Sequence, residues 1–286
     1  MYRPLDSRTD STVQKLTVLE LRKRKASGPR ITMTTAYDYT MARLFDEAGV
    51  DVVLVGDSLG MVVQGGANTL AVSIADICYH GRAVSRALQR AHLVGDMPFM
   101  SFQASPREAV KNAGKLIKAG GFESVKLEGG AHVARHVEKL VQAGIPVMGH
   151  VGLTPQAIHA FGGFKVQGKT QAATDRIVAD AVALERAGAY AVLIEAMPPD
   201  MAEQVTRAVT VPTIGIGAGR GCDGQVLVST DLLGLSRGHL PKFVKSYADL
   251  GGLAIDAARH YIDDVRSGAF PDAEHEYKPV NPASVS

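Results

Sequence analysis

The sequence predicts a single-domain α/β protein with the fold of an eight-stranded (β/α)8 TIM barrel. Glycine is frequent, at 30 of 286 residues against a usual ~7%. Ala-Gly pairs recur before short apolar runs, and a polar residue follows each run. Each such unit is typical of a helix ended by glycine and followed by a buried strand. Because helical stretches separate the runs, the strands must be parallel, and eight of them close most naturally into a barrel.

The apolar runs predict strands at residues 31–35, 51–56, 91–95, 124–127, 146–149, 191–194, 212–217 and 225–229. Apolar residues spaced about 3.6 positions apart predict helices at residues 74–89, 106–118, 133–142, 172–186 and 200–208. An open, doubly wound sheet is the competing fold. That fold usually carries a glycine-rich turn after its first strand, whereas TAYDYT stands there in this chain, so the barrel is favoured.

Three segments are predicted along the chain. An N-terminal extension covers residues 1–28, a catalytic barrel with a C-terminal helix covers residues 29–268, and a polar tail covers residues 269–286. The C-terminal helix is indicated by one apolar face, formed by Leu253, Ala254, Ala257, Ala258, Tyr261, Ile262 and Val265.

Composition and charge limit the class of protein. Lys and Arg total 31 and Asp and Glu total 29, so the formal net charge is +2 and we expect no nucleic-acid partner. Two cysteines cannot form a disulfide framework, which favours a reducing compartment. The opening residues MYRPLDSRTD contain no apolar signal, and no stretch approaches the ~20 apolar residues of a membrane span. We therefore expect a cytoplasmic protein without a membrane partner.

Polar residues at the predicted strand ends are the candidates for a functional site, because barrels of this kind carry their chemistry at the carboxyl ends of the strands. These candidates are Asp57, Asp96, Glu128, His150 and Glu195. Three or more carboxylates that converge from different strands resemble an oxygen-ligand site for a hard divalent cation such as Mg²⁺. The sequence offers no Cys/His spacing that would indicate zinc instead.

Alternation along the fourth predicted strand sets the direction of its side chains. The polar residues Ser124, Lys126 and Glu128 share one face, and the apolar residues between them share the other. The apolar face must pack on the helices, so the polar face points into the barrel. Two simpler interpretations stay open: Lys126 could merely neutralise Glu128, and His150 could be a buried histidine that bonds the loop after it.

One short motif indicates a function that its context does not support. Residues 163–170, GFKVQGKT, match the phosphate-loop pattern G-x-x-x-x-G-K-[ST]. That loop requires a strand immediately before it and a helix immediately after it. The preceding residues LTPQAIHAFG do not predict a strand, so we do not predict nucleotide binding.

Several longer motifs occur in order: TAYDYTMA (35–42), VLVGDSLGMVVQG (53–65), GDMPFMS (95–101), VKLEGG (125–130), GHVGLTPQ (149–156), FGGFKVQGK (161–169), IGIGAG (214–219), DGQ (223–225) and HLPKF (239–243). Together they resemble the ketopantoate hydroxymethyltransferase family, from about residue 31 to about residue 271. The resemblance implies conversion of 3-methyl-2-oxobutanoate to 2-dehydropantoate in pantothenate synthesis, with 5,10-methylenetetrahydrofolate as the one-carbon donor.

The resemblance also implies a Mg²⁺-dependent barrel that assembles as a homodecamer of two pentameric rings and acts on small molecules. Carried over to matching positions, it implies a metal held directly or through water by Asp57, Asp96 and Glu128. The keto acid would be contacted by Asp57, Ser58, Asp96 and Lys126, with His150 near the substrate. Glu195 would accept the proton.

Two other functions stay open. The first is that of a Mg²⁺-dependent, enolate-forming lyase or mutase, such as the isocitrate lyase and phosphoenolpyruvate mutase group. Those enzymes generally carry a catalytic cysteine or a distinctive gating loop, and neither Cys78, on a predicted helix, nor Cys222 fits that role. The second is a barrel that only binds a ligand, which is disfavoured because buried, unpaired carboxylates are costly without a use.

Overall fold

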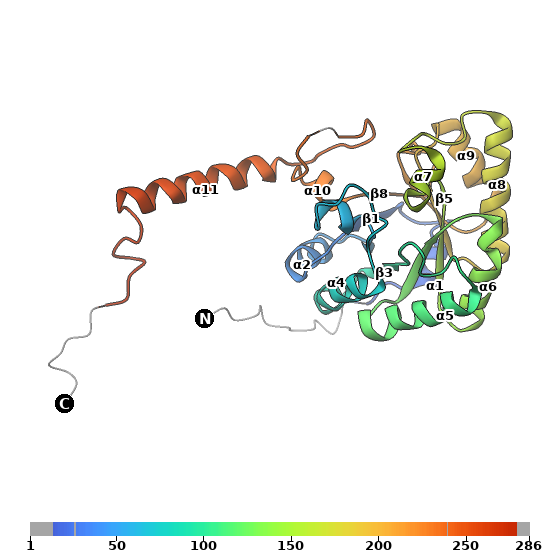
Figure 1. Cartoon of the computed structure of the whole chain (residues 1–286), viewed down its shortest axis with the longest axis horizontal. Coiled ribbons are helices and arrows are strands. Elements are labelled where there is room, and N and C mark those ends of the chain that lie inside the picture. Colours follow the sequence, from blue (N-terminus) through green and yellow to red (C-terminus); the bar gives the residue numbers. More distant parts are fainter. Residues whose placement is uncertain (1–13, 26, 239, 279–286) are drawn as a thin grey trace. The chain divides into compact units, whose positions relative to one another are not determined.

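A computed structural model describes residues 14–25, 27–238 and 240–278 (Figure 1). Eight parallel strands follow one another around a closed barrel, and β8 pairs with β1. The strands are β1 (Ile31–Thr35), β2 (Val52–Val55), β3 (His92–Asp96), β4 (Ser124–Glu128), β5 (Val147–Gly152), β6 (Ala191–Glu195), β7 (Thr213–Ile216) and β8 (Gly224–Leu227). The predicted (β/α)8 barrel is therefore confirmed, and the competing open sheet is excluded because the ring of strands closes.

Helices pack around the barrel (Figure 1), and each of them except α1, which precedes β1, lies between two successive strands in the sequence. They are α1 (Val18–Lys23), α2 (Tyr39–Glu47), α3 (Leu59–Val62), α4 (Ile74–Ala87), α5 (Pro106–Lys115), α6 (Ala134–Gln142), α7 (Ile158–Phe161), α8 (Gln171–Arg186) and α9 (Pro199–Ala208), with short turns η1 (Leu116–Gly120), η2 (Ala131–Val133) and η3 (Pro155–Ala157). Polar residues start several of them: Ser73 and Asp76 form a capping box at α4. The predicted helix at 106–118 differs at its end, where α5 gives way to the π-helical turn η1.

Apolar side chains fill the barrel below its carboxyl end. One buried cluster contains residues at alternate positions of the strands, namely Ile31, Met33, Val52, Leu54, Val94, Met148, Ala191, Leu193, Ile214 and Val226. On the outer face of the sheet, the Phe122 ring lies where a side chain on Gly81, Gly95 or Gly120 would overlap it. These glycines therefore let an aromatic ring pack between the sheet and α4.

The segment around α1 packs against the amino-terminal end of the barrel. Leu16 and Leu21 join the barrel's apolar cluster, and the Leu16 N–H donates a 2.8 Å hydrogen bond to the Arg90 carbonyl. Arg24 lies 2.7 Å from Asp51, next to the start of β2. With this end covered by the chain itself, the opposite end is left for chemistry, as in other barrels.

By its internal contacts the chain divides into two compact units. The first contains residues 1–229 and 242–244 and holds the barrel; the second contains residues 230–241 and 245–286. The second unit holds α11 (Leu250–Ser267) and most of α10 (Ser229–Leu232). The predicted boundaries after residues 28 and 268 stay predictions.

The N-terminal stretch MYRPLDSRTD and the last eight residues of the predicted tail lie outside the described residues. Among the helices of the described segments, none is both long and apolar enough to cross a membrane.

Candidate functional site

Four neighbouring strands bring a layer of polar side chains to the carboxyl end of the barrel. The register pairs Asp96 of β3 with Lys126 of β4, and Glu128 of β4 with His150 of β5. Glu195 is the last residue of β6. Asp96, Lys126, Glu128 and His150 are buried, while the Glu195 side chain stays 18% exposed. The predicted strand-end residues on these four strands are thus gathered into one group.

Lys126 lies at the centre of this group. Its Nζ lies 2.8 Å from Asp96 Oδ1, 3.4 Å from His150 Nδ1 and 3.9 Å from Glu128 Oε1. The prediction that this face of β4 points into the barrel is confirmed by these contacts. Asp96, rather than the adjacent Glu128, is the nearer carboxylate. Burial acts to lower the pKa of Lys126, but attraction to Asp96 and Glu128 outweighs burial and raises it, so Lys126 is a cation.

Asp57 joins the group from the turn after β2. Its backbone N–H donates to Asp96 Oδ2 at 3.0 Å, and Gln156 Nε2 donates to Asp57 Oδ2 at 2.9 Å. Burial raises the pKa of Asp57 well above its ordinary value, and the nearby Asp96 and Glu128 raise it further. Burial also raises the pKa of Asp96, although Lys126 opposes this shift. The raised pKa values reflect the crowding of three buried carboxyl groups, Asp57, Asp96 and Glu128, in one place.

His150 lies between two carboxylates. Its Nδ1 is 3.5 Å from Glu128 Oε1, and its Nε2 is 3.2 Å from Glu195 Oε2. Burial and Lys126 act to lower the pKa of His150, but hydrogen bonding to Glu128 and Glu195 outweighs them and raises the pKa to about 9. The raised pKa favours the protonated imidazolium at neutral pH, and its Nε2 faces the Glu195 carboxylate. The alternative of a histidine that merely bonds the next loop does not describe these contacts.

The residue that follows Asp57 has an aromatic partner. Ser58 Oγ lies 2.8 Å from the hydroxyl of Tyr37, which is buried just after β1. Burial raises the pKa of Tyr37 to about 12, so its hydroxyl stays protonated near neutral pH. Tyr37 is part of the motif TAYDYTMA, and the sequence alone predicts no role for it. The contact depends on two loops that are distant in the sequence.

Gln156 is a buried residue of the site that sequence reasoning missed. Its backbone N–H donates to Glu128 Oε2 at 3.0 Å, in addition to the contact of its side chain with Asp57. The only available signal was its position at the end of the motif GHVGLTPQ. An amide side chain in a loop carries no charge pattern, so nothing in the spacing marked it.

The donor set fits a hard divalent cation. Asp96 Oδ1 and Glu128 Oε1 are buried oxygens that face the inside of the group, 2.8 Å from Lys126 Nζ and 3.5 Å from His150 Nδ1, respectively. Over the same residues, no three His, Cys, Asp or Glu side chains form a ready set of metal ligands. Mg²⁺ usually takes one or two protein carboxylates and completes its shell with water and substrate oxygens. Asp57, Asp96 and Glu128 supply oxygens of that kind.

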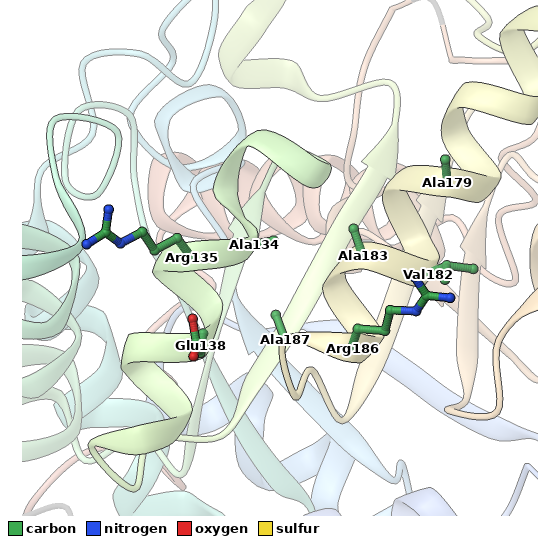
Figure 2. Close-up of a pocket in the computed structure, with 8 residues that line it drawn as sticks. All are labelled: Ala134, Arg135, Glu138, Ala179, Val182, Ala183, Arg186 and Ala187. Carbon is green, nitrogen blue, oxygen red and sulfur yellow. The ribbon is translucent and has the colours of Figure 1, made fainter.

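Two other features lie apart from this group. Residues 163–170 follow α7 rather than a strand, so the context that a phosphate loop needs is absent. A surface cavity opens between α6 and α8, on the outside of the barrel (Figure 2). It is lined by Ala134, Arg135, Glu138, Ala179, Val182, Ala183, Arg186 and Ala187. None of the predicted site residues lines it.

Several solved enzyme structures have a fold similar to that of this chain. A phosphonopyruvate hydrolase superposes with a TM-score of 0.59 at 16% identity, covering 93% of this chain and 92% of its own. A 2,3-dimethylmalate lyase of the phosphoenolpyruvate mutase and isocitrate lyase superfamily superposes with a TM-score of 0.57 at 16% identity, with the same coverage. At this identity the similarity concerns the barrel fold alone.

Sequence comparisons are far more specific. A model of the family described as ketopantoate hydroxymethyltransferase matches residues 15–273. The 3-methyl-2-oxobutanoate hydroxymethyltransferase of Clostridium novyi (strain NT) is 53% identical over 264 residues, which is 92% of this chain and 96% of the relative. That of Syntrophus aciditrophicus (strain SB) is 51% identical over 269 residues, 94% of this chain and 99% of the relative. The resemblance read from the motifs is confirmed: this chain belongs to the ketopantoate hydroxymethyltransferase family.

Proposed function

We propose that this chain transfers a hydroxymethyl unit from 5,10-methylenetetrahydrofolate to 3-methyl-2-oxobutanoate, giving 2-dehydropantoate and tetrahydrofolate. Relatives that are 51–53% identical over nearly their whole length carry the name of a hydroxymethyltransferase of that keto acid. One structural observation supports the residue roles: Glu195, the least buried carboxylate of the site, lies against a group that contains two cations, Lys126 and His150.

Glu195 is the proposed base. The hydrogen at C3 of the keto acid is α to a ketone and too weakly acidic for a free carboxylate to remove. The negative charge of the enolate must therefore be stabilised as the proton leaves. Lys126 and His150 supply two fixed positive charges for this purpose, and the contact of His150 with Glu195 holds the base in one orientation.

Asp57, Asp96 and Glu128 would hold Mg²⁺, directly or through water, and the ion would supply a Lewis acid for the keto and carboxylate oxygens of the substrate. Ser58 and Lys126 would contact the same keto acid. The hydrogen bond between Ser58 and Tyr37 limits the rotation of the Ser58 hydroxyl.

The second half of the reaction forms a carbon–carbon bond. Both bonds from the methylene carbon to folate nitrogens break in the complete reaction: a bond to C3 of the enolate replaces one, and a bond to the oxygen of a water molecule replaces the other. The water oxygen becomes the new hydroxyl group. The proton taken by Glu195 and one proton of the water are delivered to the two freed nitrogens, and tetrahydrofolate leaves.

Proton NMR in deuterated buffer tests the two halves separately. With Mg²⁺ and keto acid alone, we expect the C3 proton signal to disappear as deuterium replaces it. Addition of the folate donor should produce a new hydroxymethyl resonance. Exchange without transfer would support the enolate site and contradict the assignment of the folate as one-carbon donor. If folded protein showed neither loss of the C3 proton signal nor a hydroxymethyl resonance, the whole proposal would be contradicted and the lyase or mutase alternative favoured.

Glu195→Gln tests the base within the same assay. The amide keeps the size of the side chain but cannot accept the proton, so we expect loss of C3 exchange by several orders of magnitude with keto-acid binding largely retained. Glu203→Gln is a matched control, because Glu203 lies on the outer helix α9 and pairs with Arg207. Near-normal exchange in Glu195→Gln would show that another group is the base.

The lyase or mutase alternative finds no supporting thiol in the structure. Cys78 is buried on α4, and its Sγ lies 3.8 Å from the Lys115 carbonyl. Cys222 Sγ packs against Gly215 on the outer face of β7. Burial raises the pKa of both thiols, which makes them poor nucleophiles. We therefore retain the hydroxymethyltransferase reaction, in a cytoplasmic homodecamer, as the proposal.

A further inference from the structure

We propose that Gln156 is a positioning residue for the cation site, and that Gln103 links the loop after β3 to it. This inference rests on the proposed function, because it concerns the carboxylates assigned there to Mg²⁺. Gln156 lies in η3, just after β5, and is 5% exposed. Asp57 and Glu128 come from β2 and β4, two strands that are not neighbours. Gln156 bridges them.

Every polar group of the Gln156 side chain has a partner. Its Nε2 donates to Asp57 Oδ2 and to the Met97 carbonyl, each at 2.9 Å. Its Oε1 accepts a 2.9 Å hydrogen bond from Gln103 Nε2. A buried amide with both donors and its acceptor engaged has one orientation available to it. The amino end faces two acceptors and the oxygen faces a donor, so rotation by 180° would break all three contacts.

Gln156 holds one oxygen of each of two carboxylates. Asp57 Oδ2 is held by the side chain of Gln156, and Glu128 Oε2 is held by its backbone N–H at 3.0 Å. The other oxygen of Glu128, Oε1, is turned toward His150 Nδ1 at 3.5 Å and Lys126 Nζ at 3.9 Å. By holding one oxygen of each carboxylate, Gln156 restricts the rotation of both carboxylates. Such partners of metal ligands typically change metal affinity by 10–100-fold.

Gln103 extends the network into the loop between β3 and α5. Its own Oε1 accepts a 3.4 Å hydrogen bond from the Phe102 N–H, which orients its amide. The same loop is tied to α5 by Asn112, whose Nδ2 donates to the Ser101 carbonyl at 2.7 Å. The Met97 carbonyl at the start of this loop also binds Gln156. The loop therefore contacts the amide of Gln156 at two points, and through it the carboxylate of Asp57.

The test is calorimetric titration of the full-length protein with Mg²⁺ alone, without keto acid or folate. Gln156→Met keeps the length of the side chain and removes its three hydrogen bonds. We expect its Mg²⁺ dissociation constant to rise 10–100-fold. Gln103→Met removes only the outer link, and we expect a rise of about 3–10-fold, a part of the same effect. Gln142→Met, the same change on the exposed face of α6, should bind Mg²⁺ like the unmodified protein.

The double variant shows whether the two residues act in series. If Gln103 acts through Gln156, Gln156→Met/Gln103→Met should bind Mg²⁺ as weakly as Gln156→Met alone. Full additivity would overturn the link, and unchanged affinity in both single variants with normal unfolding temperatures would overturn the positioning role. If Gln156→Met fails to fold, the Mg²⁺ affinity of Gln103→Met still tests the network. Gln103 is half-buried, so we expect its replacement to be tolerated by the fold. No Mg²⁺ binding by the unmodified protein would instead refute the proposed cation site itself.

Discussion

Lys126 shows how one side chain can serve stability and chemistry together. Its ammonium is buried among Asp96, Glu128 and Asp57. Lys126→Met therefore leaves these three buried carboxylates without the positive charge of the ammonium. Breaking a buried pair typically costs about 3–5 kcal/mol. We expect a loss of that size in the free energy of unfolding by urea, and partial recovery with millimolar Mg²⁺, since the cation replaces the missing charge. Lys139→Met, on the exposed face of α6, should change neither quantity. Equal stability of the two variants would contradict this account.

Asp51 makes stability depend on pH. Burial acts to raise its pKa, but hydrogen bonds from Arg24, Thr32 and Arg90 outweigh burial and lower the pKa to about 2. Because the folded pKa lies below the unfolded value of ~3.9, Asp51 stabilises the fold above pH 4, by roughly 2 kcal/mol. This contribution should disappear as the pH falls from about 4 to 2. Urea unfolding of Asp51→Asn and the unmodified protein should therefore differ at pH 7 and converge near pH 2. A constant difference would refute the linkage.

At the scale of elements, the end of β5 determines where Glu195 stands. Gly152 has a φ of +91°, and a Cβ there would overlap the carbonyl oxygen of Glu195. That carbonyl also accepts a 2.9 Å hydrogen bond from the Leu153 N–H. Gly152→Ala should therefore displace the backbone of Glu195, and we expect C3 exchange to fall at least 10-fold. Gly144→Ala is matched in backbone strain, with a φ of +80°, but has open space around it.

Comparison of Gly152→Ala with Gly144→Ala separates the effect of backbone strain from displacement of Glu195, the proposed base. Both variants should lose about 1–2 kcal/mol of unfolding free energy from the positive φ alone. Only Gly152→Ala should also lose exchange activity. Equal activity of the two folded variants, measured by NMR under saturating keto acid, would show that the position of Glu195 does not depend on Gly152.

At the scale of the whole molecule, α11 bears on the expected assembly. Its apolar residues recur at helical spacing, and Leu253, Tyr261, Ile262 and Val265 are exposed in the described chain. Exposed apolar faces of this kind commonly mark contacts between subunits. Light scattering after size exclusion should give ten times the 30.2 kDa chain mass for the decamer that the family resemblance implies. Leu253→Glu/Ile262→Glu should lower that mass, whereas Arg259→Glu should not. If the unmodified protein had the mass of a monomer, the expected decamer would be contradicted.

Much of the barrel and the site was predictable because it depends on local patterns. A buried parallel strand needs a short apolar run, and a glycine commonly ends the helix before it. Seven of the eight predicted strands therefore agree with the structure to within two residues at either end. The eighth, predicted at residues 146–149, continues to Gly152. Side-chain alternation then places Lys126 and Glu128 inside the barrel. The residues at the strand ends followed from the same rule, since all parallel strands end on one side.

The contacts among those residues required the closed barrel. Gln156 and Asp57 are 99 positions apart, and they meet only because the closure of the sheet brings the loops after β2 and β5 over the same opening. The register between β4, β5 and β6 likewise determines that His150 touches both Glu128 and Glu195. Local sequence patterns specify which way a side chain points along its own strand. Which group it meets depends on the stagger of neighbouring strands and on chain closure, and these are properties of the assembled sheet.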